Sequence, residues 1–168
     1  MTRWYPVSIN YLRNAFNFNN YPIISNISYT FQYITYLDKK LKEEDLSSVI
    51  RSLLIKDYII NSISIIEALL FLLIKQSKVN IKKYSFNNLL ITTKKYNLLD
   101  IDIININNLR KLRNKVHIYD VKKACNTDYN TFNIKEFTLM KNILKSIILN
   151  NKITNYKKRY FITKYFSS

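Results

Sequence analysis

Apolar residues recur every three or four positions along most of this chain, which is the spacing that gives a helix one apolar face. The pattern is strongest between Leu46 and Gln76, where it predicts one long helix or two helices in line. Five helices are predicted in all, and helices joined by short connections form an all-α bundle. Their expected ranges are 23–42, 46–76, 85–98, 103–119 and 134–149.

The chain shows no internal repeat and no second domain, so residues 1–168 are expected to form one helical domain. Residues 1–22 lack clear periodicity and are interpreted as an N-terminal extension. Residues 151–168 form a basic, aromatic tail whose cations could hold phosphates and whose rings could stack on bases. Packing of those rings on the bundle is the favoured interpretation. Short strands remain open in both terminal segments, because Ile and Tyr also favour strands.

The composition excludes several enzyme classes. The sequence has no Gly and two Pro, so it has no Gly-rich phosphate-binding loop, no dinucleotide-binding fingerprint and no GxSxG nucleophile turn. It is rich in Ile (26), Asn (22) and Lys (21), residues with A/T-rich codons. This bias indicates an A/T-rich genome and makes any one Asn or Lys a weaker functional clue.

The formal charge of +16, from 27 basic and 11 acidic residues, attracts polyanions. Residues 101–168 carry 14 basic and 4 acidic residues, a net +10, against +6 for residues 1–100. A nucleic-acid surface is therefore expected in the second part, with RNA as the partner.

Metal chemistry has few candidate ligands. Cys125 is the only cysteine and His117 the only histidine, which excludes an internal disulfide, a cysteine zinc cluster and a two-histidine metal site. No cofactor and no metal are expected.

Two features bear on location. The N-terminal residues 1–6 contain no apolar signal-peptide core, so a cytoplasmic protein is expected. The apolar stretch Tyr58–Ile74 is interrupted by polar residues and is shorter than the ~20 apolar residues of a membrane span. It is interpreted as a buried core helix.

The candidate chemistry lies between Leu109 and Asp120. Read as a helix, this segment places Leu109, Leu112 and Val116 on an apolar stripe. A neighbouring stripe carries the only histidine, two arginines and an amide: Arg110, Arg113, Asn114 and His117.

These side chains suit RNA cleavage by attack of a 2′-hydroxyl. That reaction needs a proton moved near neutral pH, which histidine can do. It also needs a fixed cation on the phosphate, which the planar donor fork of arginine supplies. Further phosphate contacts are expected from the nearby lysines Lys111, Lys115, Lys122 and Lys123.

The segment resembles the signature of the HEPN superfamily, small all-α domains of toxins, phage-defence proteins and RNA-processing nucleases. That signature is an Arg, often followed by Asn, with four to six residues between Arg and His. Arg110 fits, with six residues before His117, whereas the pair Arg113-Asn114 has three. The two arginines are therefore alternative catalytic candidates.

The resemblance implies a metal-independent endoribonuclease that acts as a homodimer, with two motif helices facing one RNA cleft. It covers roughly residues 25–150, including Ser64–Leu70. Because an unpaired buried carboxylate is costly, Glu67 in this stretch either borders the site and pairs with Arg110 or Arg113, which is the favoured interpretation, or faces solvent. A toxin or phage-defence role follows from the family.

The run His117-Ile118-Tyr119 also resembles the ending of HEPN toxins that are paired with nucleotidyltransferase antitoxins. This implies Tyr119 as a modification site and an antitoxin or nucleotidyltransferase as a partner.

Two other interpretations stay open. The short Arg113–His117 spacing favours a HEPN-like module that binds RNA or protein without cutting. Alternatively, the chain is a structural dimer whose charge reflects its genome, with His117 at a helix end and the arginines on a solvated face.

Overall fold

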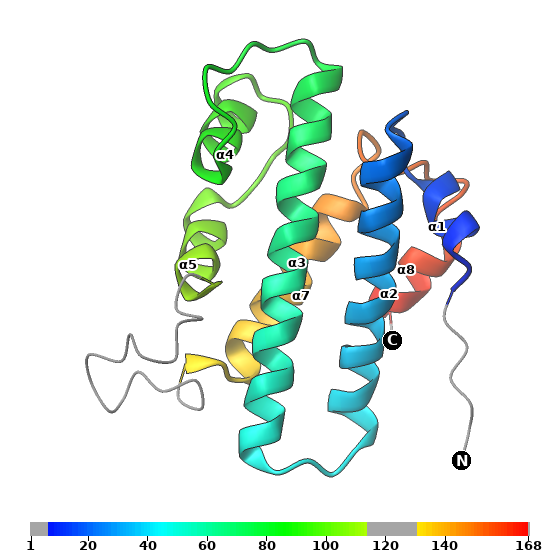
Figure 1. The fold of residues 1–168 in the computed structure, drawn as a ribbon, viewed down its shortest axis with the longest axis vertical. Coiled ribbons are helices and arrows are strands. Elements are labelled where there is room, and N and C mark those ends of the chain that lie inside the picture. The colour runs from blue at the N-terminus through cyan, green and yellow to red at the C-terminus, as the bar shows by residue number, and fades with distance from the viewer. Residues whose placement is uncertain (1–6, 114–130, 168) are drawn as a thin grey trace.

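The computed structural model describes residues 7–113 and 131–167, and in that part of the chain every regular element is helical (Figure 1). Two long antiparallel helices, α2 and α3, stand side by side, with α7 behind them, α4 and α5 beside α3, and α1 and α8 beside α2. The helices are α1 (Ile9–Ala15), α2 (Tyr21–Glu43), α3 (Ser48–Gln76), α4 (Phe86–Lys95), α5 (Ile103–Arg113), α7 (Ile134–Ile148) and α8 (Tyr160–Ser167).

The two long helices begin at side-chain caps. The Asn20 side chain accepts a hydrogen bond from the backbone N–H of Ile23 at 3.1 Å, and Ser47 accepts one from Ile50 at 3.4 Å. Such caps satisfy N–H groups that have no partner within the helix. The structure also decides between the two predictions for 46–76, because α3 is one continuous helix of 29 residues.

Without glycine, the chain ends two helices on other residues in the left-handed conformation. Lys78, just beyond α3, has φ 54°, and Asn97, just beyond α4, has φ 52°. Asn tolerates this region better than most residues because its short side chain is polar. The backbone N–H of Leu98 then donates to Thr93 at 2.9 Å, which closes the end of α4.

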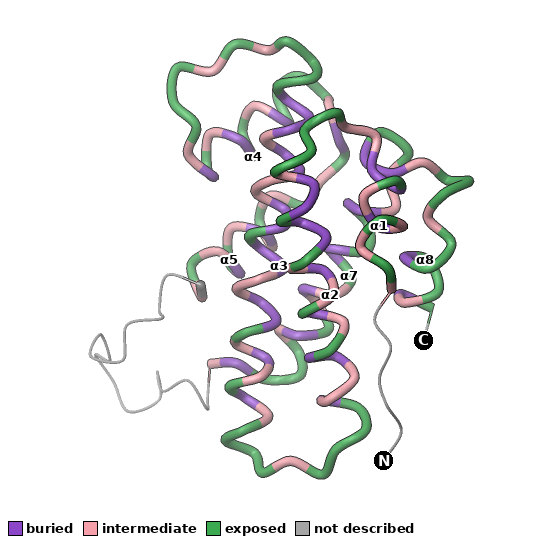
Figure 2. Tube along the Cα trace, turned by 45° about the vertical axis from the view of Figure 1, so that its right-hand side comes forward, coloured by how far each residue is buried: buried purple, intermediate pink, exposed green. Residues whose placement is uncertain are grey.

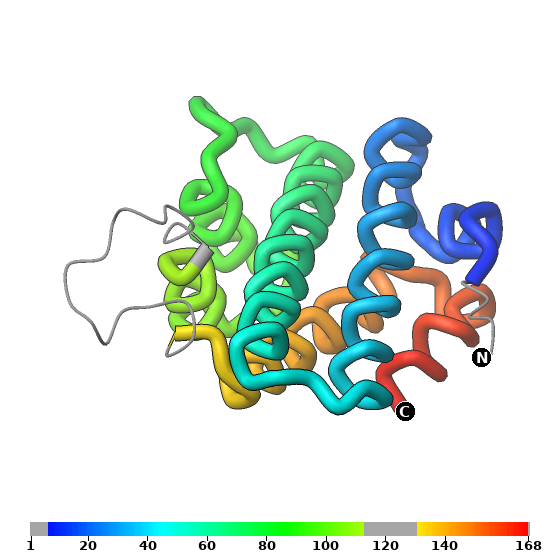
Figure 3. The backbone as a smooth tube through the Cα atoms, turned by 60° about the horizontal axis from the view of Figure 1, so that its bottom comes forward, coloured from blue at the N-terminus to red at the C-terminus, as the bar shows by residue number. Residues whose placement is uncertain are grey.

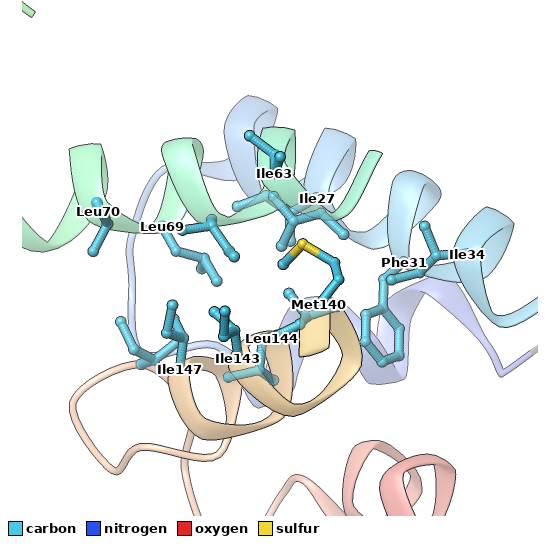
Figure 4. Close-up of a cluster of buried hydrophobic side chains, with 14 of the residues drawn as sticks. Ile27, Phe31, Ile34, Ile63, Leu69, Leu70, Met140, Ile143, Leu144 and Ile147 are labelled. Carbon is cyan, nitrogen blue, oxygen red and sulfur yellow. The ribbon is translucent and has the colours of Figure 1, made fainter. Parts of the chain in front are cut away.

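The core lies where α2, α3 and α7 meet (Figure 4). Phe31 of α2, Ile63 and Leu69 of α3, and Met140 and Leu144 of α7 point toward one another and are almost fully buried. The predicted helices 23–42 and 134–149 supply two sides of this core with the apolar faces expected from their spacing.

Helix α3 is the one helix in the described part that is long and apolar enough to cross a membrane, judged by length and composition. Within the protein, 61% of its most apolar window is buried. Figure 2 shows buried positions along most of its length. The stretch Tyr58–Ile74 therefore lies in a core helix, as the polar interruptions predicted.

The expectation of five helices was incomplete, because both terminal segments also contain a helix. Figure 3 shows helical turns near both the blue and the red end of the chain. In α1, Leu12 and Ala15 are fully buried, and in α8, Ile162 and Phe166 are buried. Helices of seven and eight residues are marginal on their own. Docking on the bundle stabilises them, which sequence spacing does not reveal.

The strands left open for the terminal segments amount to one isolated bridge in the described residues, between Phe16 and Thr154. The backbone N–H of Asn17 donates to Ile153 at 2.9 Å, and that of Asn155 donates to Ala15 at 2.8 Å. Backbone hydrogen bonds thus join the N-terminal and C-terminal segments at these residues.

Two cations of the predicted tail donate hydrogen bonds to backbone carbonyls of the bundle. The guanidinium of Arg159 donates to the carbonyl of Leu149 at the end of α7, and the ammonium of Lys152 donates to the carbonyl of Leu98 at 2.7 Å. Basic side chains are favourable at helix C-termini, where carbonyls lack partners. Three aromatic rings of the tail remain exposed: Tyr156, Tyr160 and Phe161.

We expect Leu144→Ala to lower the free energy of unfolding by about 2–5 kcal/mol, because the truncation leaves a cavity at the junction of three helices. Ile104→Ala is the control, since Ile104 is 75% exposed on α5, and it should change stability by less than about 0.5 kcal/mol. Urea denaturation followed by circular dichroism measures both. Equal effects of the two substitutions would contradict the proposed core.

Candidate functional site

The helix that carries the predicted site is fixed at its start by an acidic cap. Asp102 accepts a hydrogen bond from the backbone N–H of Asn105 at 3.0 Å and another from the Asn105 side-chain amide at 2.6 Å. These two hydrogen bonds lower the pKa of Asp102, because they stabilise its ionised form. The predicted start of this helix near Asp102 is confirmed.

The register of α5 matches the predicted apolar stripe. Ile106 and Leu109 are buried, and Leu112 is partly buried against the core. This face packs on α3, with further contacts to α4 and α7. The stripe Leu109–Leu112 is therefore confirmed, and Val116 lies outside the described residues.

Arg110 lies on the flank of α5, next to the buried Leu109. It is half-buried, and its Nε donates to the side-chain oxygen of Asn107 at 3.2 Å. Asn107 was not singled out in the sequence; its place one helical turn before Arg110 was the available signal. This hydrogen bond fixes one edge of the planar guanidinium relative to α5.

The other members of the predicted site are placed only in part. Lys111 is exposed on α5, and Arg113 is the last described residue of that helix. Glu67 is half-buried on α3, the helix on which α5 packs. Its pairing with Arg110 or Arg113 stays a prediction. The remaining predicted residues lie outside the described part: Asn114, Lys115, His117, Tyr119, Lys122 and Lys123.

A second group of charged side chains lies between α2, α7 and α8, and it was not predicted. Oδ2 of Asp38 accepts a hydrogen bond from the ammonium group of Lys141 at 3.0 Å and forms an ion pair with that of Lys42 at 3.1 Å. The side chain of Asp38 is 4% exposed, and its Oδ1 is buried with no hydrogen-bond partner. The available signal was position, since Asp38 continues the spacing of the buried Phe31 and Ile34.

Two tyrosines connect this group to the core. The hydroxyls of Tyr58 and Tyr165 lie 3.0 Å apart, and the ammonium of Lys141 sits 5.1 Å from the centre of the Tyr165 ring. Burial raises the pKa of both tyrosines, and the negative charge of Asp38 raises them further. Both phenols are therefore neutral at physiological pH and act as hydrogen-bonding groups.

No protein-family model, curated protein or solved structure matches the chain. The HEPN resemblance accordingly rests on the sequence motif.

We expect Asp102→Ala to loosen the first turn of α5. The hydrogen-exchange rates of the Asn105 and Ile106 amides should rise, while those in α7 stay unchanged. Because the folded pKa of Asp102 is lowered, the cap acts above the ordinary pKa of an aspartate and is lost as pH falls through the lowered value. Asp100→Ala is the matched control, since Asp100 is also exposed but lies outside the helix. Similar exchange in both variants would refute the cap.

We expect Asp38→Ala to lower the free energy of unfolding by about 3–5 kcal/mol, because it leaves the ammonium group of Lys141, whose side chain is 17% exposed, without its carboxylate. Asp45→Ala is the control, since Asp45 is exposed in the α2–α3 loop, and it should have little effect. Thermal or urea unfolding measures both. A loss below about 1 kcal/mol for Asp38→Ala would show that its charge is solvated.

Proposed function

We propose that the chain is a metal-independent endoribonuclease of HEPN type, with its site on α5 and the residues that follow it. The observation that carries this proposal is the register of α5. Burial of Leu109 leaves Arg110 on the flank of the helix, and Arg113 follows one turn later in the same helix. Two guanidiniums spaced in this way can bind the oxygens of one phosphate.

The proposed reaction uses only side chains of the protein. His117 takes the proton from a 2′-hydroxyl, which attacks the adjacent phosphorus, and a proton returns to the departing 5′-oxygen. Arg110 and Arg113 stabilise the negative charge that builds up on the phosphate. Asn114 orients the phosphate or the imidazole. The products are an RNA end with a cyclic phosphate and an end with a free 5′-hydroxyl.

The proposal includes a homodimer in the cytoplasm, in which two motif helices face one RNA strand. Lys111, exposed on α5, together with Lys115, Lys122 and Lys123 supplies the positive charge that attracts the RNA. A toxin or phage-defence role is the biological context. An antitoxin or nucleotidyltransferase acting on Tyr119 is the proposed partner.

A second candidate function is RNA or protein binding without cleavage. The observation that favours it is the spacing of the Arg-Asn pair, because only three residues separate Arg113 from His117. In this case the same helix would bind phosphates, and removal of the histidine would leave the affinity for RNA unchanged.

The test is RNA cleavage by the purified full-length chain in the presence of a chelator. His117→Ala should slow cleavage by about a hundredfold or more, since a general acid or base contributes about 10²–10⁴-fold. Arg110→Ala and Arg113→Ala should each slow it, and the larger loss identifies the catalytic arginine.

Lys82→Ala, an exposed cation in the loop between α3 and α4, is the matched control and should cleave at the wild-type rate. Equal rates for His117→Ala and the wild type would refute the nuclease. The second candidate would be favoured if neither the wild type nor any variant cleaves RNA while the wild type binds RNA with an affinity that falls as salt rises.

A further inference from the structure

Residues of α1, α2 and α8 line a pocket of about 670 Å³. Figure 1 shows these three helices on the side of α3 away from α5. Its volume is in the range of small-molecule sites. Leu12 and Phe31 are buried beneath its surface, and the accessible apolar side chains that line it include Tyr11 and Phe161. A ligand with an aliphatic or aromatic body can therefore bury that body here.

One end of the pocket is charged, and its accessible side chains carry a net positive charge. Asp38 lines this end but is 4% exposed, whereas the side chain of Lys42 is 42% exposed and that of Lys39 is 31% exposed. Lys164 of α8 also lines the pocket and is exposed. The carboxylate of Asp38 is covered, whereas that of Glu43 is 62% exposed and pairs with Lys39, so the accessible charges are three ammonium groups and one carboxylate.

The cations at this end outnumber the acids that balance them. Lys39 is matched by Glu43, 3.5 Å away, but Lys42 and Lys141 share the one carboxylate of Asp38. Lys164 has no ion pair within the described part of the chain.

The surplus has an electrostatic consequence at Lys141. Burial lowers the pKa of Lys141, and the neighbouring charge of Lys42 lowers it further, although Asp38 acts in the opposite direction. A second anion at this end would stabilise both ammonium groups.

We propose that this pocket binds a small amphipathic carboxylate, with its carboxylate on Lys42 and Lys164 and its aliphatic or aromatic body on Tyr11 and Phe161. The surplus positive charge disfavours a cationic ligand. A simple inorganic anion would leave Tyr11 and Phe161 in contact with water. The proposal is independent of the ribonuclease, because α5 and this pocket lie on opposite sides of α3 (Figure 1).

The test is calorimetric titration of the full-length chain with three probes of the same chain length: octanoate, octanol and octylammonium. Octanoate should bind at one site and at least tenfold more tightly than octanol, and octylammonium should show no binding. Equal affinity for octanoate and octanol would overturn the proposal, because the lysines would then play no part.

Variants locate the two ends of the ligand. Lys42→Met and Lys164→Met should each weaken octanoate binding about three- to tenfold and leave octanol binding unchanged. Phe161→Ser should weaken both. Lys158→Met is the matched control, because Lys158 is exposed and does not line the pocket, and it should change the affinity less than twofold.

If Lys42→Met unfolds the protein because the Lys42–Asp38 pair is lost, Lys164→Met still tests the proposal. Equal weakening by Lys158→Met and Lys164→Met would overturn the proposal, because it would show attraction to the net charge of the whole chain. Absence of octanoate binding, including a case in which the pocket is closed by association with another protein molecule, would overturn it too.

Discussion

The structure depends on covering α3. This helix runs for 29 residues and is apolar on nearly all sides, so it is stable in water only when other helices surround it. Helices α2 and α7 cover two sides, and α4 and α5 cover another. Each of these helices needs only one apolar stripe, because α3 supplies the opposing surface. The same arrangement places the candidate RNA site and the α1–α2–α8 pocket on opposite sides of one core helix.

The carboxylate of Asp38 is a charged group buried at the edge of this apolar packing. A lone carboxylate at such a position would be strongly unfavourable, and two lysines compensate it, one from α2 and one from α7. Tyr165 of α8 lies against the same group and reaches the hydroxyl of Tyr58 in α3. The charged group therefore links four helices, and it also creates the surplus of positive charge at the edge of the pocket.

On the opposite side of α3, the packing of α5 fixes where the basic residues of that helix lie. Codon bias can explain the number of lysines in this chain, but it does not explain why Arg110 lies beside a buried leucine and is held by Asn107. Packing of the apolar stripe fixes the rotation of the helix about its axis, so each remaining residue of α5 lies on a defined face. Because of this fixed rotation, the proposal of a phosphate site on α5 rests on the packing of the helix as well as on the sequence motif.

Periodicity alone determined the all-helical class, five of the helices (α2, α3, α4, α5 and α7) and the inward face of α5, because each depends on apolar spacing within one segment. It also singled out Arg110, Arg113, Asn114 and His117, although the structure describes only the first two of these positions. Only the tertiary structure decided that both termini are helical, that Asp38 meets Lys141, and that α1, α2 and α8 enclose a pocket. These features join residues far apart in the chain, such as Asp38 and Lys141, and local spacing holds no information about which distant segments will meet.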